Sequence, residues 1–345
     1  MTDASAKKNG KLLEVQDLKI YYPVHAGVFL RKVGDVKAVD GVSFSVKEGE
    51  TLGLVGESGC GKTTVGKGIM RLIDVTSGAV RFTTKAGPTV DLVPLDRGQM
   101  RPLRAEIQMI YQDPFSSLNP RWSVGDIISE PLGVHMAHLS QKERDDKVAW
   151  LLEKVGLRPE QAFRYPHEFS GGQRQRVGIA RALATAPRLL VADEPVSALD
   201  VSIQAQVINL MQDLQQEFGL SYIFIAHGLS VVEHISHRIA VMYLGNMVEI
   251  GPAREVYAKP IHPYTKALIS AVPLPDPQVT RPDRQRLQGE VPSPLAKPSG
   301  CPFRTRCPVA VKSCAEQLPP LVEVAPERFV ACPVVAGASA PARPA

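Results

Sequence analysis

A glycine-rich stretch directly after a short apolar run dictates the local fold near the start of this chain. Residues 56–64 read Gly-Glu-Ser-Gly-Cys-Gly-Lys-Thr-Thr, which matches the pattern G-x-x-x-x-G-K-[ST]. The preceding residues 51–55 have the length and composition of a buried strand, and residues 65–72 have a helical pattern. A strand, a glycine loop and a helix in that order are the context in which this motif cradles phosphates. We therefore expect the chain to bind a nucleoside triphosphate.

The loop residues have separate chemical tasks. Glycines let successive backbone N–H groups turn toward phosphate oxygens, and the N-terminus of the following helix adds positive potential. Lys62 can reach the β- and γ-phosphates, and the Thr63 hydroxyl can bind Mg²⁺. We interpret Cys60 as a small structural residue rather than a nucleophile. The residues predicted to contact the nucleotide here are Gly56, Glu57, Ser58, Gly59, Cys60, Gly61, Lys62, Thr63 and Thr64.

Two adjacent carboxylates end a second apolar run, residues 189–192. Strand alternation predicts that Asp193 and Glu194 point to different sides and have different tasks. Asp193 suits the magnesium shell, and Glu194 suits the polarisation of an attacking water. About 20 residues earlier, Ser170, Gly171, Gly172 and Gln173 precede a helical pattern. Serine and glycine at a helix N-terminus form a second phosphate-binding corner.

The first 251 residues alternate strand-like and helix-like segments, which is typical of an α/β domain. A helix-rich block spans about residues 123–185, in which Ser140 and Glu143 predict a capping box. Eighteen of the 29 prolines fall in residues 252–345, so we expect an irregular extension there. Residues 337–345 are small and proline-rich, and we expect them to be disordered. Further strands are predicted at residues 107–111, 222–226 and 239–243.

Composition excludes several classes of protein. The formal net charge is +5, too small and too evenly spread to indicate nucleic-acid binding on its own. No apolar run reaches the 18 or so residues that cross a bilayer. The first ten residues lack the apolar segment of a secretory signal. We expect a cytoplasmic protein with no membrane-spanning helix, which leaves docking on a membrane protein open.

The order of these motifs resembles the ATP-binding subunit of an ABC transporter over about residues 13–251. The resemblance implies a P-loop ABC ATPase core, that is, a RecA-like parallel sheet plus an antiparallel β subdomain. It also implies an inserted helical subdomain at about residues 123–185. The domains would be a nucleotide-binding domain, residues 1–251, and a cysteine-containing extension, residues 252–345. A P-loop kinase or GTPase would lack the Ser170–Gln173 motif, and a soluble ABC protein of translation or DNA repair would carry two cassettes or a long coiled coil.

The resemblance also implies roles for single residues. Gln112 would touch Mg²⁺ and sense the membrane partner, and His227 would contact the γ-phosphate beside the base Glu194. Asp200 would lie in the loop that faces a second subunit. Tyr22 would stack on adenine, with Tyr21 as the competing choice. By the same resemblance, Ser170, Gly171, Gly172 and Gln173 would close on ATP held by the other subunit, and magnesium would be bound by Thr63, Gln112 and Asp193.

Longer phrases resemble the dipeptide/oligopeptide importer group in particular. They include residues 111–121, residues 165–177, and His-Pro-Tyr-Thr-Lys-Ala-Leu at residues 262–268. The insertion at residues 23–37 is similar to that of the second, F-type ATPase subunit. This implies a heterodimer with a sister ATPase, two transmembrane permease subunits, an extracytoplasmic peptide-binding protein, and a peripheral position on the cytoplasmic face of the membrane. Nickel, opines or glutathione stay open as cargo, because transported substrate does not touch this subunit.

Three residues depart from the usual family pattern. Phe169 stands where leucine is common, and Thr63 stands where serine is common; the chemistry allows both. Gly228 follows the switch histidine where this group usually has aspartate. Glycine is a weaker helix cap than aspartate, so we expect a looser loop around His227.

Four of the five cysteines gather near the end of the chain, at Cys301, Cys307, Cys314 and Cys332. The spacing C-x5-C-x6-C-x17-C lacks the tight pairs of zinc sites, while iron–sulfur clusters accept more varied spacing. The residues alone leave an iron–sulfur cluster, zinc and free thiols open. The resemblance favours a [4Fe–4S] cluster in a structural role.

Overall fold

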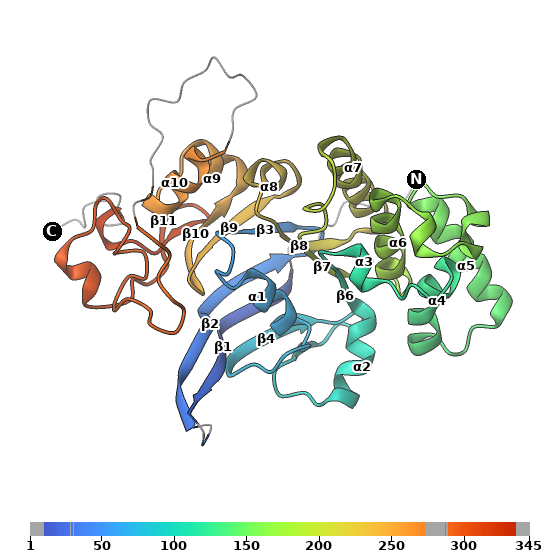
Figure 1. The fold of residues 1–345 in the computed structure, drawn as a ribbon, viewed down its shortest axis with the longest axis horizontal. Helices are drawn as coiled ribbons and strands as arrows, with labels where there is room; N and C mark the ends of the chain where they lie inside the picture. The colour runs from blue at the N-terminus through green and yellow to red at the C-terminus, as the bar shows by residue number, and fades with distance from the viewer. Residues whose placement is uncertain (1–9, 28, 30, 273–286, 288, 336–345) are drawn as a thin grey trace, which may run out of the picture.

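The structure, a computed structural model, describes residues 10–27, 29, 31–272, 287 and 289–335. Its described part is built around two sheets, with a helical block at one end (residues 114–183) and residues 289–335 at the opposite end (Figure 1). The glycine loop lies between these two ends, after the strand of residues 51–55.

The larger sheet has the strand order β11-β12-β10-β9-β3-β8-β7-β6. From β9 to β6 all neighbouring strands run parallel, and the strands β10, β12 and β11 extend the sheet with antiparallel pairs. Every residue of β3, β7 and β8 is buried, because helices and the second sheet cover both faces. The predicted strands are confirmed to within one residue: β3 (Thr51–Val55), β6 (Ile107–Ile110), β7 (Leu189–Asp193), β8 (Ser221–Ile225) and β9 (Arg238–Tyr243).

The smaller sheet is antiparallel, with the order β2-β1-β4-β5. Its strands are β1 (Lys11–Ala26), β2 (Arg31–Lys47), β4 (Ser77–Thr83) and β5 (Thr89–Asp91). The two long strands β1 and β2 form a hairpin that projects from the body of the molecule (Figure 1). The insertion expected at residues 23–37 is the outer part of this hairpin, since Pro23 pairs with Asp35.

Helices pack on both faces of the larger sheet and divide the core in two. One buried cluster joins α1 to the smaller sheet, and the other joins α6, α7 and α8 to the opposite face. Close approach requires glycine at Gly53 in β3, where a Cβ would lie 2.2 Å from the Val232 side chain of α8. The helices on the sheet are α1 (Lys62–Ile69), α2 (Arg97–Glu106), α6 (Gly171–Leu183), α7 (Val201–Phe218) and α8 (Leu229–Ile235).

The helical block is set by reciprocal caps. Three serines cap helices in this way: Ser123, Ser140 and Ser170. Each serine hydroxyl accepts from the N–H three residues later, and each serine N–H donates to the side chain of that same residue, which satisfies two backbone donors per helix start. The capping box predicted at Ser140 is thus confirmed, and the apolar face of the helix that follows it is buried. Besides α6, the block contains α3 (Pro114–Ser117), α4 (Val124–His135), α5 (Gln141–Lys154), η1 (Pro159–Phe163) and η2 (Pro166–Glu168).

The C-terminal extension is more regular than expected. Its strand β12 pairs with β10 (Asn246–Pro252), with Val330 opposite Glu249, so the extension adds strands to the main sheet. The irregular extension expected from the sequence thus also contains short strands, which have too few residues to show alternation in the sequence. The disorder predicted for residues 337–345 lies outside the described residues. The elements are α9 (Ala253–Ala258), α10 (Pro263–Ser270), η3 (Lys312–Ala315), β11 (Val322–Ala325) and β12 (Arg328–Val330).

Among the helices that the structure describes, none is both long and apolar enough to cross a lipid bilayer.

Candidate functional site

The glycine loop connects β3 to α1 in a conformation that only glycine allows at two points. Gly61 has a φ of +106°, and a Cβ there would lie 2.2 Å from the Ala38 carbonyl oxygen. A Cβ on Gly56 would lie 2.3 Å from the carbonyl oxygen of Met242. The loop thus packs closely against β2 on one side and β9 on the other, while Ser58 and Gly59 are exposed. The exposed middle of the loop leaves backbone N–H groups at the surface for an anion.

Lys62 points back into the loop that precedes it. Its Nζ donates to the carbonyl oxygens of Gly56, at 2.8 Å, and Glu57, at 3.1 Å. The side chain is buried, so the ammonium charge sits at the concave side of the loop. Cys60 is buried too, and burial raises the pKa of its thiol although nearby Lys62 lowers it. A thiol that stays protonated supports the structural role expected for Cys60.

Thr63 and Asp193 meet at the C-terminal end of the parallel strands. The Thr63 hydroxyl donates to Asp193 Oδ1 over 2.8 Å, although the two residues are 130 positions apart. Adjacent oxygen ligands in an octahedral magnesium site with bonds of 2.0–2.1 Å stand about 2.9 Å apart. Burial raises the pKa of Asp193, and the lysines of α1 lower it. These two oxygens therefore fit a magnesium ion, whose charge would hold Asp193 ionised.

Glu194 lies just beyond the end of β7 in a strained conformation. Its φ is +48°, a region that costs a non-glycine residue about 1–3 kcal/mol. From the sequence we expect strand alternation to point Asp193 and Glu194 to different sides. That reason is wrong, because β7 ends at Asp193 and the backbone turns at Glu194. Its backbone N–H donates to the Ile225 carbonyl oxygen over 2.9 Å, which ties the turn to β8.

Two predicted residues converge on the Glu194 carboxylate. The Gln112 side chain donates from Nε2 to Oε2 over 2.8 Å, and His227 Nε2 lies 2.5 Å from Oε1. Glu194 is buried, while Gln112 and His227 are exposed, so the carboxylate lies beneath two side chains that solvent reaches. Gly228 caps α8 without any side-chain bond, as its glycine identity implies. The structure thus brings Gln112, Glu194 and His227 together from β6, β7 and β8.

The two candidate adenine residues differ in their partners. Tyr21 donates its hydroxyl to Asp40, and the Lys37 ammonium lies 5.4 Å from its ring centre. Tyr22 is 42% exposed on the next position of β1. Tyr21 is therefore occupied by intramolecular contacts, whereas the ring of Tyr22 is open to a flat ligand.

The Ser170–Gln173 motif forms the N-terminus of α6. The Ser170 hydroxyl accepts from the Gln173 N–H over 3.3 Å, and Gln173 Oε1 accepts from the Ser170 N–H over 3.0 Å. A Cβ on Gly172 would lie 2.5 Å from the Ile203 side chain of α7, so glycine lets the two helix starts meet. Asp200 caps α7 without a side-chain bond and is exposed. Ser170 and Asp200 are thus exposed at the starts of two helices, α6 and α7, that approach each other at Gly172 and Ile203.

The four C-terminal cysteines are gathered in one region. Burial and, to a smaller extent, the neighbouring thiols together raise the pKa of the Cys301 thiol to about 11. The Cys301 N–H donates to the Cys314 carbonyl oxygen over 2.8 Å. Yet within the part of the chain that the structure describes, no three His, Cys, Asp or Glu side chains are placed to hold a metal ion. The expected [4Fe–4S] site is not borne out by this arrangement, nor is a zinc site.

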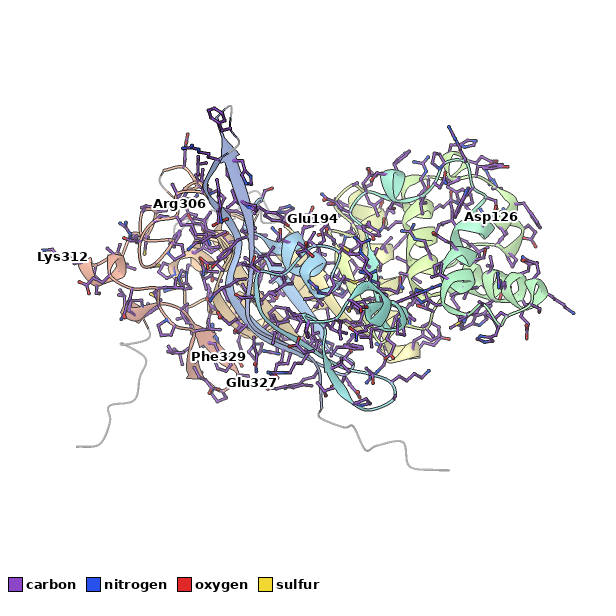
Figure 2. All side chains as sticks on the ribbon, turned by 90° about the horizontal axis from the view of Figure 1, so that it is seen from below. Asp126, Glu194, Arg306, Lys312, Glu327 and Phe329 are labelled. Carbon is purple, nitrogen blue, oxygen red and sulfur yellow. The ribbon has the colours of Figure 1, made fainter. Side chains whose placement is uncertain are left out.

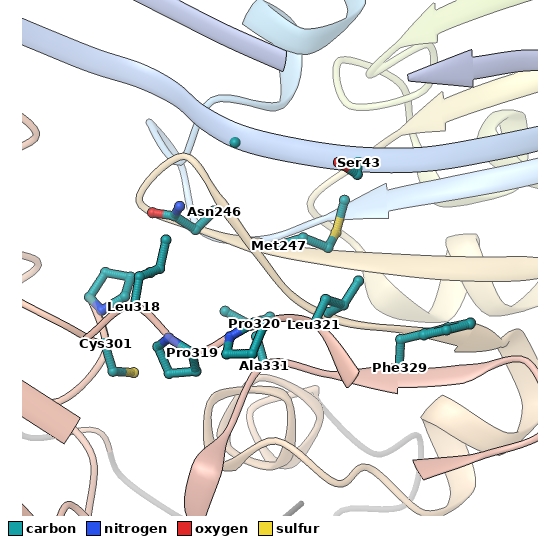
Figure 3. Close-up of a pocket in the computed structure, with 13 residues that line it drawn as sticks. Ser43, Asn246, Met247, Cys301, Leu318, Pro319, Pro320, Leu321, Phe329 and Ala331 are labelled. Carbon is teal, nitrogen blue, oxygen red and sulfur yellow. The ribbon is translucent and has the colours of Figure 1, made fainter. Parts of the chain in front are cut away.

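A cavity lies beside these cysteines and away from the nucleotide loop. Its volume is about 480 Å³, and residues of β2, of β10 and of the extension line it (Figure 3). The side chains around it include Met247, Pro319, Leu321 and Phe329, so its walls are mostly apolar. No residue predicted to bind nucleotide lines it.

Sequence reasoning missed two residues that contact the nucleotide loop. Tyr264 accepts a hydrogen bond from the Glu57 N–H over 2.8 Å, and Arg306 pairs with the Glu57 carboxylate at 2.8 Å. Tyr264 lies within residues 262–268, which were noted only as a mark of resemblance, and Arg306 directly precedes Cys307. Their spacing of more than 200 positions from Glu57 hides the contact from the sequence.

Comparisons with known proteins cover both parts of the chain. A family model described as "ABC transporter" matches residues 39–197, and one described as "Oligopeptide/dipeptide transporter, C-terminal region" matches residues 248–314. The chain is 55% identical over 330 residues to the oligopeptide transport ATP-binding protein AppF of Bacillus subtilis, which covers 95% of this chain and 98% of that protein. It is 55% identical over 313 residues to the oligopeptide transport ATP-binding protein OppF of Salmonella typhimurium, with 90% and 92% covered.

Solved structures share the fold at lower identity. The dimeric structure of MJ0796, a bacterial ABC transporter cassette, has a TM-score of 0.61 at 26% identity and covers 70% of this chain and 99% of that one. The cbiO1 structure from Clostridium perfringens, part of the ABC transporter complex cbiONQ, has a TM-score of 0.60 at 26% identity, with 72% and 91% covered. The glycine loop, Ser170 and Glu194 all fall within the first matched region, and Tyr264 and Arg306 fall within the second.

Proposed function

This chain belongs to the ABC transporter family, and from that membership we propose that it is the ATP-binding and ATP-hydrolysing subunit of an importer of dipeptides or oligopeptides. The observation that supports hydrolysis most strongly is the contact of Glu194 with both Gln112 and His227. It stands beside the Thr63–Asp193 pair, at the ends of neighbouring strands. The peptide cargo follows the names of the relatives, which are oligopeptide transport ATP-binding proteins.

In the proposed reaction, Glu194 accepts a proton from the attacking water. The water oxygen forms a bond to the γ-phosphorus, the bond from that phosphorus to the β-phosphate bridging oxygen breaks, and ADP and phosphate leave. Lys62 and the loop N–H groups bind the phosphates, and His227 holds the γ-phosphate edge. Magnesium, bound by Thr63, Asp193 and Gln112, would neutralise phosphate charge. The Glu194 side chain is aligned by Gln112 and His227 before ATP arrives.

The proposal includes a second subunit. Ser170 of the Ser170–Gln173 motif is exposed, and the motif forms the N-terminus of α6. We propose that it closes head to tail on ATP held by a sister ATPase, with Asp200 at the same contact. The sister is a different chain, because importers of this group pair two unlike ATPases. A head-to-tail dimer made only of this chain is the alternative outcome of a mass measurement on the native complex.

Two transmembrane permeases and an extracytoplasmic peptide-binding protein complete the proposed assembly. This chain would sit on the cytoplasmic face of the membrane and dock on the permeases through the Gln112 loop and the helical block. The exposed aromatic side chains there, Tyr111, Phe115 and Trp122, support that surface. The nucleotide-binding domain would span residues 1–251, with its helical subdomain at about 123–185, and the extension would span residues 252–345.

We also propose that the four gathered cysteines hold a [4Fe–4S] cluster as a structural staple. Their shared region and the Cys301–Cys314 backbone bond support it. Cys301, Cys307, Cys314 and Cys332 would hold the cluster through their thiolates, which are the usual ligands of iron–sulfur clusters. Iron and acid-labile sulfide in anaerobically purified protein, at about four of each per chain and lost in Cys307→Ser, would support the cluster. Zinc alone, or no metal, would contradict it.

Reconstitution tests the whole proposal. The chain is purified with its encoded membrane partners, placed in vesicles, and supplied with labelled oligopeptide and ATP. We expect uptake that needs ATP and that Lys62→Ala abolishes, because that variant lacks the phosphate-binding ammonium. A preparation that hydrolyses ATP without membrane partners and imports no peptide would instead favour a non-transport ABC ATPase.

A further inference from the structure

The extension is anchored beside the nucleotide loop by one fully buried ring. Phe303 packs against Tyr243 of β9 with ring centres 5.2 Å apart, and against Tyr264 of α10 with ring centres 5.4 Å apart. All three rings are buried, and His262 completes the cluster. Aromatic contacts of this kind fix the position of the segment that carries them. The turn that starts at Phe303 is therefore held at a fixed place next to β9.

Tyr264 contacts the loop backbone. Its hydroxyl accepts a hydrogen bond from the Glu57 N–H over 2.8 Å, and its side chain is completely buried. Glu57 directly follows Gly56 in the phosphate-binding loop. Backbone N–H groups of such a loop are its phosphate donors, so the bond to Tyr264 occupies the donor of Glu57.

Arg306 contacts the side chain of the same loop residue. Its Nη1 donates to Glu57 Oε2 over 2.8 Å and its Nη2 donates to Oε1 over 3.2 Å, a two-point pairing of guanidinium and carboxylate. The Arg306 N–H donates to the Phe303 carbonyl oxygen over 3.0 Å, which ties the arginine to the anchored turn. The Arg306 side chain is only 8% exposed. Burial alone would lower the pKa of Arg306, but the Glu57 carboxylate raises it above its usual value.

The charge balance at Glu57 matters to a phosphate ligand. A carboxylate in the loop repels a triphosphate, and this carboxylate is neutralised by a cation that comes from the extension. Arg306 reaches it from the side of the molecule opposite the helical block that carries Asp126 (Figure 2). Lys62 in turn donates to the Glu57 carbonyl oxygen, so Glu57 connects the extension with the phosphate-binding lysine.

We propose that Tyr264 and Arg306 form a clamp on Glu57 by which the C-terminal extension sets the conformation and charge of the nucleotide loop, and so the ATP affinity of this subunit. Tyr264 and Arg306 are positioning residues that act through Glu57. The inference rests on the proposed ATP-binding function. It gives residues 252–345 a task at the nucleotide site in addition to any role of the cysteines.

The test measures binding without turnover. The full chain is titrated with a fluorescent ATP analogue and Mg²⁺. An unlabelled, non-hydrolysable ATP analogue then displaces the fluorescent one in competition. We expect Arg306→Ala to weaken binding about tenfold, because an unpaired carboxylate then faces the phosphates. Arg306→Lys should recover part of the affinity, and Tyr264→Phe should weaken binding while keeping the buried ring. Arg304→Ala is the matched control, since the Arg304 side chain makes exposed bonds to Ser299, away from Glu57, and its loss should leave affinity unchanged.

A double-mutant cycle separates the clamp from a general loss of folding. In Glu57→Gln the repulsive charge is gone, so Arg306→Met should cost far less affinity there than in the parent chain. Thermal midpoints measured without nucleotide show whether each variant is folded. If Arg306→Ala is unfolded, the affinity of Tyr264→Phe decides the test. Equal affinity of Arg306→Ala, Tyr264→Phe and the parent would overturn the proposal, as would an undiminished loss in the Glu57→Gln background. Failure of the proposed function is distinct: the parent and Lys62→Ala would then bind the analogue equally.

Discussion

At the scale of single residues, the site depends on one glutamate whose backbone is strained. Glu194 combines a positive φ with two side-chain contacts, from Gln112 and His227. Backbone strain of this kind persists only where surrounding contacts hold the residue in place. Here the bond from the Glu194 N–H to the Ile225 carbonyl oxygen is one such contact. The contacts hold the carboxylate in one orientation, which supports the role of Glu194 as general base.

His227→Ala provides a test of that orientation. We expect ATP binding to persist and turnover to fall about 10²-fold, because the phosphate edge and Glu194 both lose a partner. Binding and steady-state hydrolysis are measured in the assembled transporter. His234→Ala is the control, since His234 is an exposed histidine of the neighbouring helix α8. Equal turnover in the two variants would remove His227 from the mechanism.

Sequence reasoning found residues whose spacing is local and missed contacts between distant segments. The loop and the acidic pair were predicted because each lies within one short motif. The choice between Tyr21 and Tyr22 needed the structure, since it depends on the bond from Tyr21 to Asp40. Arg306 gave no local signal, because its partner Glu57 lies 249 positions away.

At the scale of elements, caps and buried strands were predictable and short strands were not. The serine cap of α5, the start of α6 after Ser170 and the five parallel strands follow from pattern alone. Strand β12 (Arg328–Val330) has too few residues to alternate, and only its pairing with β10 reveals it. Helix α10 has an unusual N-cap, His262, whose Nδ1 accepts from the Tyr264 N–H over 3.1 Å.

His262 makes stability depend on pH. Burial lowers its pKa to about 3, whereas histidine in the unfolded chain titrates near 6.5. The unfolded state therefore binds more protons below pH 6.5, and folding loses stability as pH falls through that range. We expect a loss of about 1.4 kcal/mol from this group between pH 7.5 and 5.5.

Urea unfolding of the parent and His262→Asn at pH 7.5 and 5.5 measures that contribution. Asparagine keeps a side-chain cap acceptor but does not titrate, so the variant should lose less stability in acid than the parent. Identical acid dependence of the two proteins would show that His262 is not the group responsible.

At the scale of the whole molecule, the extension is part of the core. Strand β12 continues the main sheet, and Arg328 pairs with Glu249 of β10 over 2.9 Å. The Glu249 carboxylate is fully buried and also accepts from the N–H groups of Ile261 and His262. One carboxylate thus joins β10, the segment before α10, and β12.

Arg328→Ala should therefore destabilise the protein by about 3–5 kcal/mol, because it leaves a buried carboxylate without its cation. Glu249→Gln combined with Arg328→Met removes both charges and should cost less than Arg328→Ala alone. Chemical denaturation of the two variants and the parent gives the comparison. A double variant less stable than Arg328→Ala would contradict this account of the buried pair.

The central claim is that this chain hydrolyses ATP with Glu194 as the base, and Glu194→Gln tests it most directly. Glutamine keeps the size and the hydrogen-bonding geometry but cannot accept the proton. In the assembled transporter we expect the variant to bind ATP as the parent does and to lose nearly all turnover. Retained hydrolysis with intact ATP binding would contradict the assignment of Glu194.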